Sequence, residues 1–282
     1  MSDPGFDRLH DGALAAIGAL CARSLADPPD PDELARTLFA PDQPVVVRGD
    51  PDVGVVATAE GIAAVGSAGQ GFVRLLVVAP EHRGHGTGRS LLAAAEADAR
   101  AAGLRSLTTG ADAPYYLWPG VESSELSLLC LLERLRYARV EANLNMDVEL
   151  ASIPADPGGW TAAGPAEREE IKAWGAQHWA NWELELVRAA ERDTLVISRD
   201  ADGIAAVCAY DVNRAGWIGP VAVRPDRLGQ GAGVAPLLGA LHRMRARGRA
   251  RAEIGWVGPI VPYARIGATV GRVFFVHRKE LR

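Results

Sequence analysis

"VVAPEHRGHGTGRSLL", residues 77–92, places three glycines within five positions between an apolar run and an alanine-rich stretch. "VAVRPDRLGQGAGVAPLL", residues 221–238, repeats this pattern at a constant offset of 145 residues. The same offset matches five further pairs: Val78 with Val223, Pro80 with Pro225, Gly103 with Gly248, Gly110 with Gly255, and Pro114 with Pro259. Such agreement between small or special residues indicates that the chain contains two homologous modules.

The register of the repeat changes after Tyr116. Residues 131–150, "LLERLRYARVEANLNMDVEL", match residues 262–281, "PYARIGATVGRVFFVHRKEL", at an offset of 131. The first module therefore carries 14 additional residues, which we expect to form a loop containing "WPGVESSEL". Between the modules, "ASIPADPGG" has the composition of a linker, so the predicted domains are residues 1–152 and 157–282.

Apolar periodicity and turn residues predict the same α/β order of elements in both modules. Helices are expected first, at residues 12–26, 31–39 and 166–190. Three strands follow in each module, at residues 44–50, 54–60 and 72–80, and at residues 193–200, 203–210 and 217–223. A helix comes after each glycine cluster and ends at Gly103 or Gly248, where a left-handed glycine is common. A strand, a short helix and a long final strand complete each module.

Bulk composition limits the classes of function. The formal net charge of −5 argues against a protein that mainly grips nucleic acid or an anionic membrane, because both need a sustained cationic surface. The three cysteines form no CxxC pair, so we expect neither a zinc site nor a disulfide framework. This cysteine pattern favours a reducing cytoplasm. The amino-terminal apolar patch lacks a cationic flank and is not expected to be a signal peptide.

The glycine loops suggest an anion site. A strand that passes through a tight glycine loop into a helix directs several unpaired N–H groups and the positive end of the helix dipole toward one point. We expect some of these glycines to adopt positive φ. Neither GxxxxGK[ST] nor GxGxxG is present, since the spacing is Arg83-Gly-His-Gly86-Thr-Gly88. The alternative is that the glycines only permit close packing of strand against helix.

This spacing, with a proline three residues before the arginine, resembles the acetyl-CoA pyrophosphate loop of the GNAT superfamily of N-acetyltransferases. The segment "YARIGA" resembles the Tyr-Glu-Lys-Leu-Gly-Phe segment of the same superfamily. The resemblance covers nearly the whole chain and implies a tandem protein. Each module is then expected to have a mixed, mostly antiparallel central sheet flanked by helices, with the fourth strand splayed from the fifth.

The resemblance also implies where acetyl-CoA binds. Pantetheine is expected to pair with the backbone of Leu76 and Val78, or of Val221 and Val223. The loop residues expected to hold the diphosphate are Arg83, Gly84, His85, Gly86, Thr87 and Gly88 in module one, and Leu228, Gly229, Gln230, Gly231, Ala232 and Gly233 in module two.

Direct attack of an amine on the thioester requires a base for the ammonium proton and benefits from a proton donor for the thiolate. The family's tyrosine donor falls on Tyr263 in module two, whereas module one has Leu132 at that position. Conversely, module two has Leu228 where module one has Arg83. We therefore hypothesise that module two is catalytic and that module one binds CoA or serves structure. Glu253 is the candidate base, although it equally suits a strand end that points outward.

Aromatic and polar residues recur at helical spacing in "AWGAQHWANWELEL". In GNAT proteins this segment borders the acceptor site, so the resemblance implies a substrate-binding role for Trp174, His178, Trp182 and Glu185. Core packing is the alternative for such a stripe. In module one, "PYYLWPGV" at residues 114–121 is expected either to line the cleft or to pack between the modules.

The leading hypothesis is an acetyl-CoA-dependent N-acetyltransferase that acts on a small-molecule primary amine. The expected protein uses no metal, binds neither nucleic acid nor membrane, and is a monomer or homodimer. The alternative is a catalytically inactive sensor of CoA or acyl-CoA. An enzyme of nucleotide phosphates is disfavoured, because the loop lysine and acidic metal ligands after the strands are absent.

Overall fold

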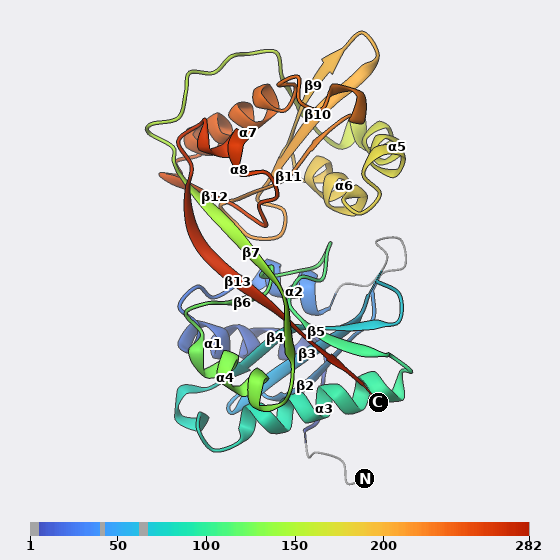
Figure 1. Cartoon of the computed structure of the whole chain (residues 1–282), viewed down its shortest axis with the longest axis vertical. Coiled ribbons are helices and arrows are strands. Elements are labelled where there is room, and N and C mark those ends of the chain that lie inside the picture. The colour runs from blue at the N-terminus through green and yellow to red at the C-terminus, as the bar shows by residue number, and fades with distance from the viewer. Residues whose placement is uncertain (1–5, 40–42, 62–66, 282) are drawn as a thin grey trace. The chain divides into compact units, whose positions relative to one another are not determined.

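The computed structural model describes residues 6–39, 43–61 and 67–281 (Figure 1). The chain divides into two compact units. Unit 1 comprises Met1–Asn143 together with Phe274–Arg282, and unit 2 comprises Leu144–Val273. No helix in the described part of the chain has the length and apolarity that a bilayer crossing demands.

Unit 1 contains a central sheet covered by helices on both faces (Figure 1). Its strands are hydrogen-bonded in the order β1-β2-β3-β4-β5-β13, and β6 also pairs with β13. Strands β4 and β5 run parallel, and the pairs β1–β2, β2–β3, β3–β4, β5–β13 and β6–β13 are antiparallel. The elements in chain order are β1 (Arg8–Leu9), α1 (Leu14–Ser24), α2 (Pro31–Leu38), β2 (Val45–Asp50), β3 (Gly54–Glu60), β4 (Gln70–Val78), α3 (Thr87–Ala101), β5 (Ser106–Thr109), β6 (Val121–Glu122), α4 (Leu126–Arg134) and the first half of β7 (Ala138–Glu149).

Two apolar layers make the core of unit 1. Helices α1 and α2 pack through Ile17 and Leu34 on one face of the sheet, against residues such as Val55. Helices α3 and α4 pack through Leu91 and Leu132 on the opposite face. The sheet is thus buried on both sides, as the long apolar runs of its strands require.

Unit 2 repeats this architecture. Its strands follow the order β8-β9-β10-β11-β12-β7, and the β11–β12 pair is parallel. Helices α5 and α6 cover one face, and α7 and α8 cover the other. The elements are β8 (Thr161–Ala163), α5 (Arg168–His178), α6 (Glu183–Glu191), β9 (Leu195–Asp200), β10 (Gly203–Tyr210), β11 (Trp217–Val223), α7 (Val234–Ala246), β12 (Arg251–Ile254), α8 (Ile260–Ala264) and the first part of β13 (Thr269–Glu280).

The compact units differ from the sequence modules at their last strands. In unit 2, the carboxyl half of β7 pairs with β12, for example Val148 with Ala252. In unit 1, the carboxyl end of β13 pairs with β5, for example Arg278 with Thr108. Each unit therefore completes its sheet with a strand that the repeat assigns to the other module.

Both parallel pairs end at the residue that precedes a bulge in the upstream strand. In β4 the register with β3 shifts at Arg74, because Ala57 pairs with Leu75 while Thr58 pairs with Val73. The β4–β5 register ends one residue before this bulge, at Val73 and Thr109. In β11 the corresponding irregularity involves Gly219, which lies 145 residues after Arg74, and pairing with β12 ends at Ile218 and Ile254.

Most predicted elements are confirmed by the structure. The strands expected at residues 54–60, 203–210 and 217–223 have the bounds of β3, β10 and β11. The single helix expected at residues 166–190 is wrong, because the chain turns at residues 179–182 and forms α5 and α6. A Cβ on Gly175 would lie 3.1 Å from the Cα of Glu183, so this glycine lets the second helix pack closely against the first.

Phe274 offers a test of the strand exchange. Its side chain is fully buried, and it pairs with Glu122 of β6 in unit 1. We expect Phe274→Ala to lower the free energy of unfolding by about 3–5 kcal/mol, measured by urea denaturation. Hydrogen exchange should accelerate in β5 more than in β12. Val270→Ala, at an exposed position of the same strand, is the control. Faster hydrogen exchange in β12 alone would contradict the assignment of this end of β13 to unit 1.

Candidate functional site

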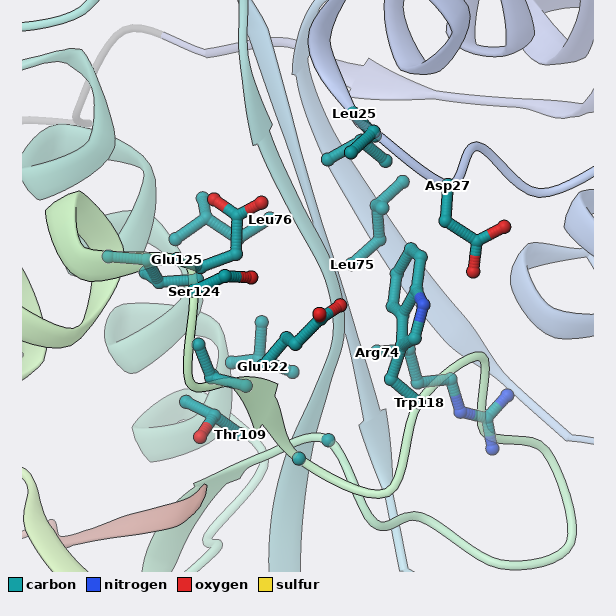
Figure 2. Close-up of a pocket in the computed structure, with 16 residues that line it drawn as sticks. Leu25, Asp27, Arg74, Leu75, Leu76, Thr109, Trp118, Glu122, Ser124 and Glu125 are labelled. Atoms are coloured by element: carbon teal, nitrogen blue, oxygen red, sulfur yellow. The ribbon is translucent and has the colours of Figure 1, made fainter. Parts of the chain in front are cut away.

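A cavity of about 140 Å³ lies in unit 1 where β4 diverges from β5 (Figure 2). Figure 2 shows Glu122, Ser124 and Glu125 on one side of this cavity, and Trp118 and Asp27 on the other. The floor is formed by the carboxyl half of β4. The lining residues are Leu25, Ala26, Asp27, Val73, Arg74, Leu75, Leu76, Thr109, Gly110, Trp118, Gly120, Val121, Glu122, Ser124, Glu125 and Leu128.

The glycine loop of unit 1 follows the same strand. Gly84 and Gly86 have φ of 78° and 93°, so the expected positive φ is confirmed, and a Cβ on either would meet nothing within 4 Å. Helix α3 begins at Thr87, directly after the loop. Within the described residues, no acceptor is found for the N–H groups of residues 84–88. These donors and the amino-terminal end of α3 therefore suit a bound anion.

Arg83 ties this loop to its surroundings. Its Nε donates to the carbonyl oxygen of Val78 at 3.1 Å, and its Nη2 donates to that of Ser24 at 2.6 Å. The arginine thus joins the end of β4 to the end of α1. In this arrangement the side chain supports the shape of the loop, while the backbone supplies the donors. His85 lies exposed on the same loop.

The loop of unit 2 has similar backbone angles but fewer available donors. Gly229 and Gly231 have φ of 74° and 82°. However, within residues 229–233, which match residues 84–88, the N–H of Gln230 donates to the carbonyl oxygen of Arg227 at 3.3 Å. Helix α7 begins only at Val234, after Ala232 and Gly233. The second loop therefore satisfies part of its own hydrogen-bonding capacity.

Carboxylates also neutralise the arginines beside the second loop. Arg227 and Arg224 each approach Asp200 to 2.7 Å, and Arg227 also pairs with Asp202 at 3.0 Å. The two guanidinium groups hold the pKa of Asp200 far below its usual range. Asp226 completes the network. An incoming phosphate would meet these carboxylates as well as the arginines.

Comparisons with known proteins agree with this geometry. Residues 17–115 match the model of the acetyltransferase (GNAT) family. A tandem GNAT protein from the clavulanic acid biosynthesis pathway superposes with a TM-score of 0.70 at 17% identity, covering 98% of both chains. The chain has a tandem GNAT fold. The resemblance and the fold class expected from the sequence are thereby confirmed.

Two further GNAT structures support the same fold. A GCN5-related N-acetyltransferase from Sphaerobacter thermophilus has a TM-score of 0.68 at 22% identity, covering 100% of this chain and 97% of its own. A glucosamine N-acetyltransferase region of a fungal multi-domain β-N-acetylglucosaminidase has a TM-score of 0.78 at 20% identity, covering 97% of this chain. This chain spans only 38% of that fungal protein. No curated protein sequence matches the chain.

Tyr263, the donor that the GNAT resemblance suggests, is buried in unit 2. It belongs to the apolar cluster that contains Cys208 and Ile254. Burial, with a smaller contribution from Cys208, raises the pKa of the Tyr263 hydroxyl above its ordinary value. In unit 1, Leu132 at the matching position is fully buried in the core. A raised pKa keeps Tyr263 protonated, and its role as a donor stays a prediction.

Glu253, the candidate base, is engaged by its neighbours. Both carboxylate oxygens accept from Arg272, at 2.9 and 2.8 Å, and Oε1 also accepts from Asn145 at 2.5 Å. The residue is partly buried at the pairing position opposite Trp217 of β11. Such a bidentate pair fixes the end of β12, and it occupies both carboxylate oxygens.

The residues of unit 2 that were predicted to bind the amine substrate do not form one helical face. Trp174 and His178 are in edge contact, with ring centroids 5.5 Å apart, and line an open groove. Trp182 instead packs against Trp256, with ring centroids 6.2 Å apart. Glu185 is buried in the core. The turn between α5 and α6 separates these residues, because helical spacing does not continue through it.

The cavity of unit 1 contains functional candidates that sequence reasoning missed. Arg74 is a charged residue within the apolar run of β4, and this feature is visible in the sequence. Glu122, Ser124 and Glu125 lie in the 14-residue addition, whose position gave no role to individual side chains. Trp118 and Val121 agree with the expectation that residues 114–121 line the cleft. In the described part of the chain, no cluster of His, Cys, Asp or Glu could hold a metal.

Glu185 provides a test through pH. Burial raises its pKa to about 8, one oxygen accepts from Asn213, and Oε2 has no hydrogen-bond partner among the described residues. The folded state then binds more protons than the unfolded state above pH 4.5. The free energy of unfolding of the protein should therefore fall by up to about 1.4 kcal/mol per pH unit as pH rises toward 8.

We expect Glu185→Gln to remove most of this decline, so that the variant is the more stable protein above pH 8. Thermal or urea unfolding between pH 5 and 9 measures the effect. Glu183→Gln, on the same helix at a more exposed position, is the control. Parallel curves for wild type and Glu185→Gln would show that the buried carboxyl does not titrate as described.

Proposed function

We propose that this protein is an acetyl-CoA-dependent N-acetyltransferase whose site lies in unit 1. The observation that carries the proposal is the combination of unengaged loop N–H groups and a cavity at the divergence of β4 and β5, within one unit. The matching GNAT family model covers the same part of the chain, residues 17–115. The CoA-sensing alternative is not favoured by any of these observations.

The residues of unit 1 fit the shape and charge of the CoA carrier. The N–H groups of Gly84 to Gly88 would hold the diphosphate, because positive φ at Gly84 and Gly86 leaves the backbone open to close approach. Beyond Val73, β4 has no paired residue on β5, so the backbone near Leu76 and Val78 is the natural partner for pantetheine. When bound, acetyl-CoA supplies the activated acetyl thioester.

A primary amine that enters the cavity must lose a proton before it can attack. Alkylamines have a pKa near 10.4, so they arrive protonated at neutral pH. The carboxylate of Glu122, directed into the cavity in Figure 2, is our candidate acceptor for that proton. Leu132 stands where a tyrosine donor would be, so the departing thiolate takes a proton from solvent and leaves as the thiol.

This proposal moves turnover from the second module to the first. The sequence-based hypothesis favoured module two because of Tyr263. Against it stand the hydrogen bond from the N–H of Gln230 to Arg227 within the second loop, the ion pairs of Arg227, and the engagement of Glu253 by Arg272. In addition, the indole N–H of Trp179 donates to the carbonyl of Val223 at 2.9 Å, at a position expected to face pantetheine.

The acceptor is proposed to be a small molecule with a primary amine. The fungal structural neighbour is described as a glucosamine N-acetyltransferase region, so glucosamine belongs in the first panel of amines. The panel should also contain linear diamines and amino alcohols, since cavity shape decides acceptor choice. Release of free thiol from acetyl-CoA reports turnover with any of them.

The two glycine loops supply a matched pair of variants. We expect Gly86→Glu to weaken acetyl-CoA binding at least about tenfold, because a carboxylate side chain blocks and repels the diphosphate. Gly231→Glu has a similar backbone strain, since φ is 93° at Gly86 and 82° at Gly231, and should leave binding unchanged. Isothermal titration calorimetry measures both. Loss of binding in Gly231→Glu alone would place the carrier in unit 2.

A second set of variants separates the two candidate centres. We expect Glu122→Gln to lower kcat by about 10²-fold or more, in the range of a lost general base. Tyr263→Phe should retain turnover, because the hydroxyl belongs to the other unit. Steady-state thiol release with the best amine of the panel measures both values. The reverse pattern would restore the assignment of catalysis to the second module.

A further inference from the structure

We propose that the buried Arg74–Asp112 ion pair is a positioning device that fixes the wall of the unit 1 cavity and thereby sets acceptor binding. The proposal rests on the function proposed above, since it assigns the cavity to the acceptor. It concerns neither the loop that holds the diphosphate nor the carboxylate that takes the proton.

The guanidinium of Arg74 joins several segments of unit 1. Its Nε lies 2.6 Å from Oδ2 of Asp112, and both side chains are almost completely buried. Nη1 donates to the carbonyl of Thr37 at 2.9 Å, and Nη2 donates to Oε1 of Gln43. The guanidinium carbon also lies 4.9 Å from the ring centroid of Tyr115. Helix α2, the segment after it and the segment after β5 are therefore held at one point.

From Asp112, backbone hydrogen bonds lead to the cavity wall. The N–H of Gly110 donates to Val73 at 2.9 Å, which is the last bond between the two diverging strands. Next to Asp112, the N–H of Ala111 donates to the carbonyl of Trp118 at 3.2 Å. Ala111 has a φ of 58°, an unusual conformation that the surrounding contacts must hold. Trp118 and Gly110 both line the cavity.

The bulge itself does not require this ion pair. At the matching position of unit 2 the residue is Gly219, so the equivalent irregularity forms there without a charged side chain. Figure 2 shows the side chain of Arg74 directed away from Glu122, so the arginine does not reach the reacting groups. What unit 1 gains from Arg74 is a fixed position for the segment that begins at Gly110.

The charges of Arg74 and Asp112 also depend on each other. Burial raises the pKa of Asp112 to about 6, although Arg74 acts in the opposite direction. Oδ1 of Asp112 has no hydrogen-bond partner among the described residues. Without the arginine, the pKa of this carboxyl, which is 1% exposed, would rise further, and the side chain would lose both its ion pair and its hydrogen bond, so the segment would no longer be fixed at this point.

The experiment compares Arg74→Met and Asp112→Asn with Arg48→Met. Arg48 forms an ion pair with Asp98 at the same distance of 2.6 Å, but that pair is partly exposed, and neither residue lines the cavity. Hydrogen exchange at Gly110 and Ala111 should accelerate at least about tenfold in the first two variants, with β2–β3 amides unchanged. The acetyl-CoA Kd, measured by calorimetry, should stay within about twofold of wild type.

With the best amine of the panel, the acceptor KM should rise about tenfold or more, while kcat falls less. Uniform acceleration of exchange across unit 1 would overturn the proposal, because it indicates general destabilisation. Unchanged exchange at Gly110 and Ala111 would also overturn it. If the wild type fails to bind acetyl-CoA, the proposed function falls, and the exchange data still decide whether the pair holds the segment. Asp112→Asn preserves shape and serves if Arg74→Met does not fold.

Discussion

The end of parallel pairing between β4 and β5 is the constraint on which the candidate site depends. Pairing stops at Val73 and Thr109, so the rest of β4 keeps a neighbour on one edge only. Unpaired backbone groups need other partners, and a divergence of two strands provides room for one. The cavity lies at this divergence, and the glycine loop follows at the end of the same strand. One local change of register thus brings backbone donors and a cavity into one unit.

Duplication allows the two copies to be compared within one molecule. The glycines after both strands have positive φ, so both loops turn the chain in a similar way from strand to helix. The difference lies in what surrounds them. In unit 2, Asp200 and Asp202 pair with Arg227, and the N–H of Gln230 donates to the carbonyl oxygen of Arg227. In unit 1, the described residues supply no acceptors for residues 84–88.

The sequence was sufficient to predict the duplicated fold, and it was less informative about the site. Glycine positions and apolar runs are local signals, so the loops and most strands could be located from them. The Arg74–Asp112 pair joins positions 38 residues apart through a bulge, which no local pattern encodes. The break between α5 and α6 depends on close packing at Gly175, and helical periodicity alone does not reveal it. Pairing of Glu253 with Arg272 likewise depends on tertiary contact.

The glycine motif therefore indicates how the chain turns from strand to helix, and it does not by itself indicate that an anion binds. A positive φ at Gly84 or Gly229 is needed to connect strand and helix, whether or not an anion binds there. The motif can consequently persist in a copy that no longer holds the carrier. Binding requires in addition that the N–H groups lack internal acceptors and that nearby cations lack internal anions. Within the described residues, all five N–H groups of residues 84–88 meet the first condition, whereas in the matching loop of unit 2 the N–H of Gln230 does not, and so the proposed site is assigned by hydrogen bonds and charges and not by motif.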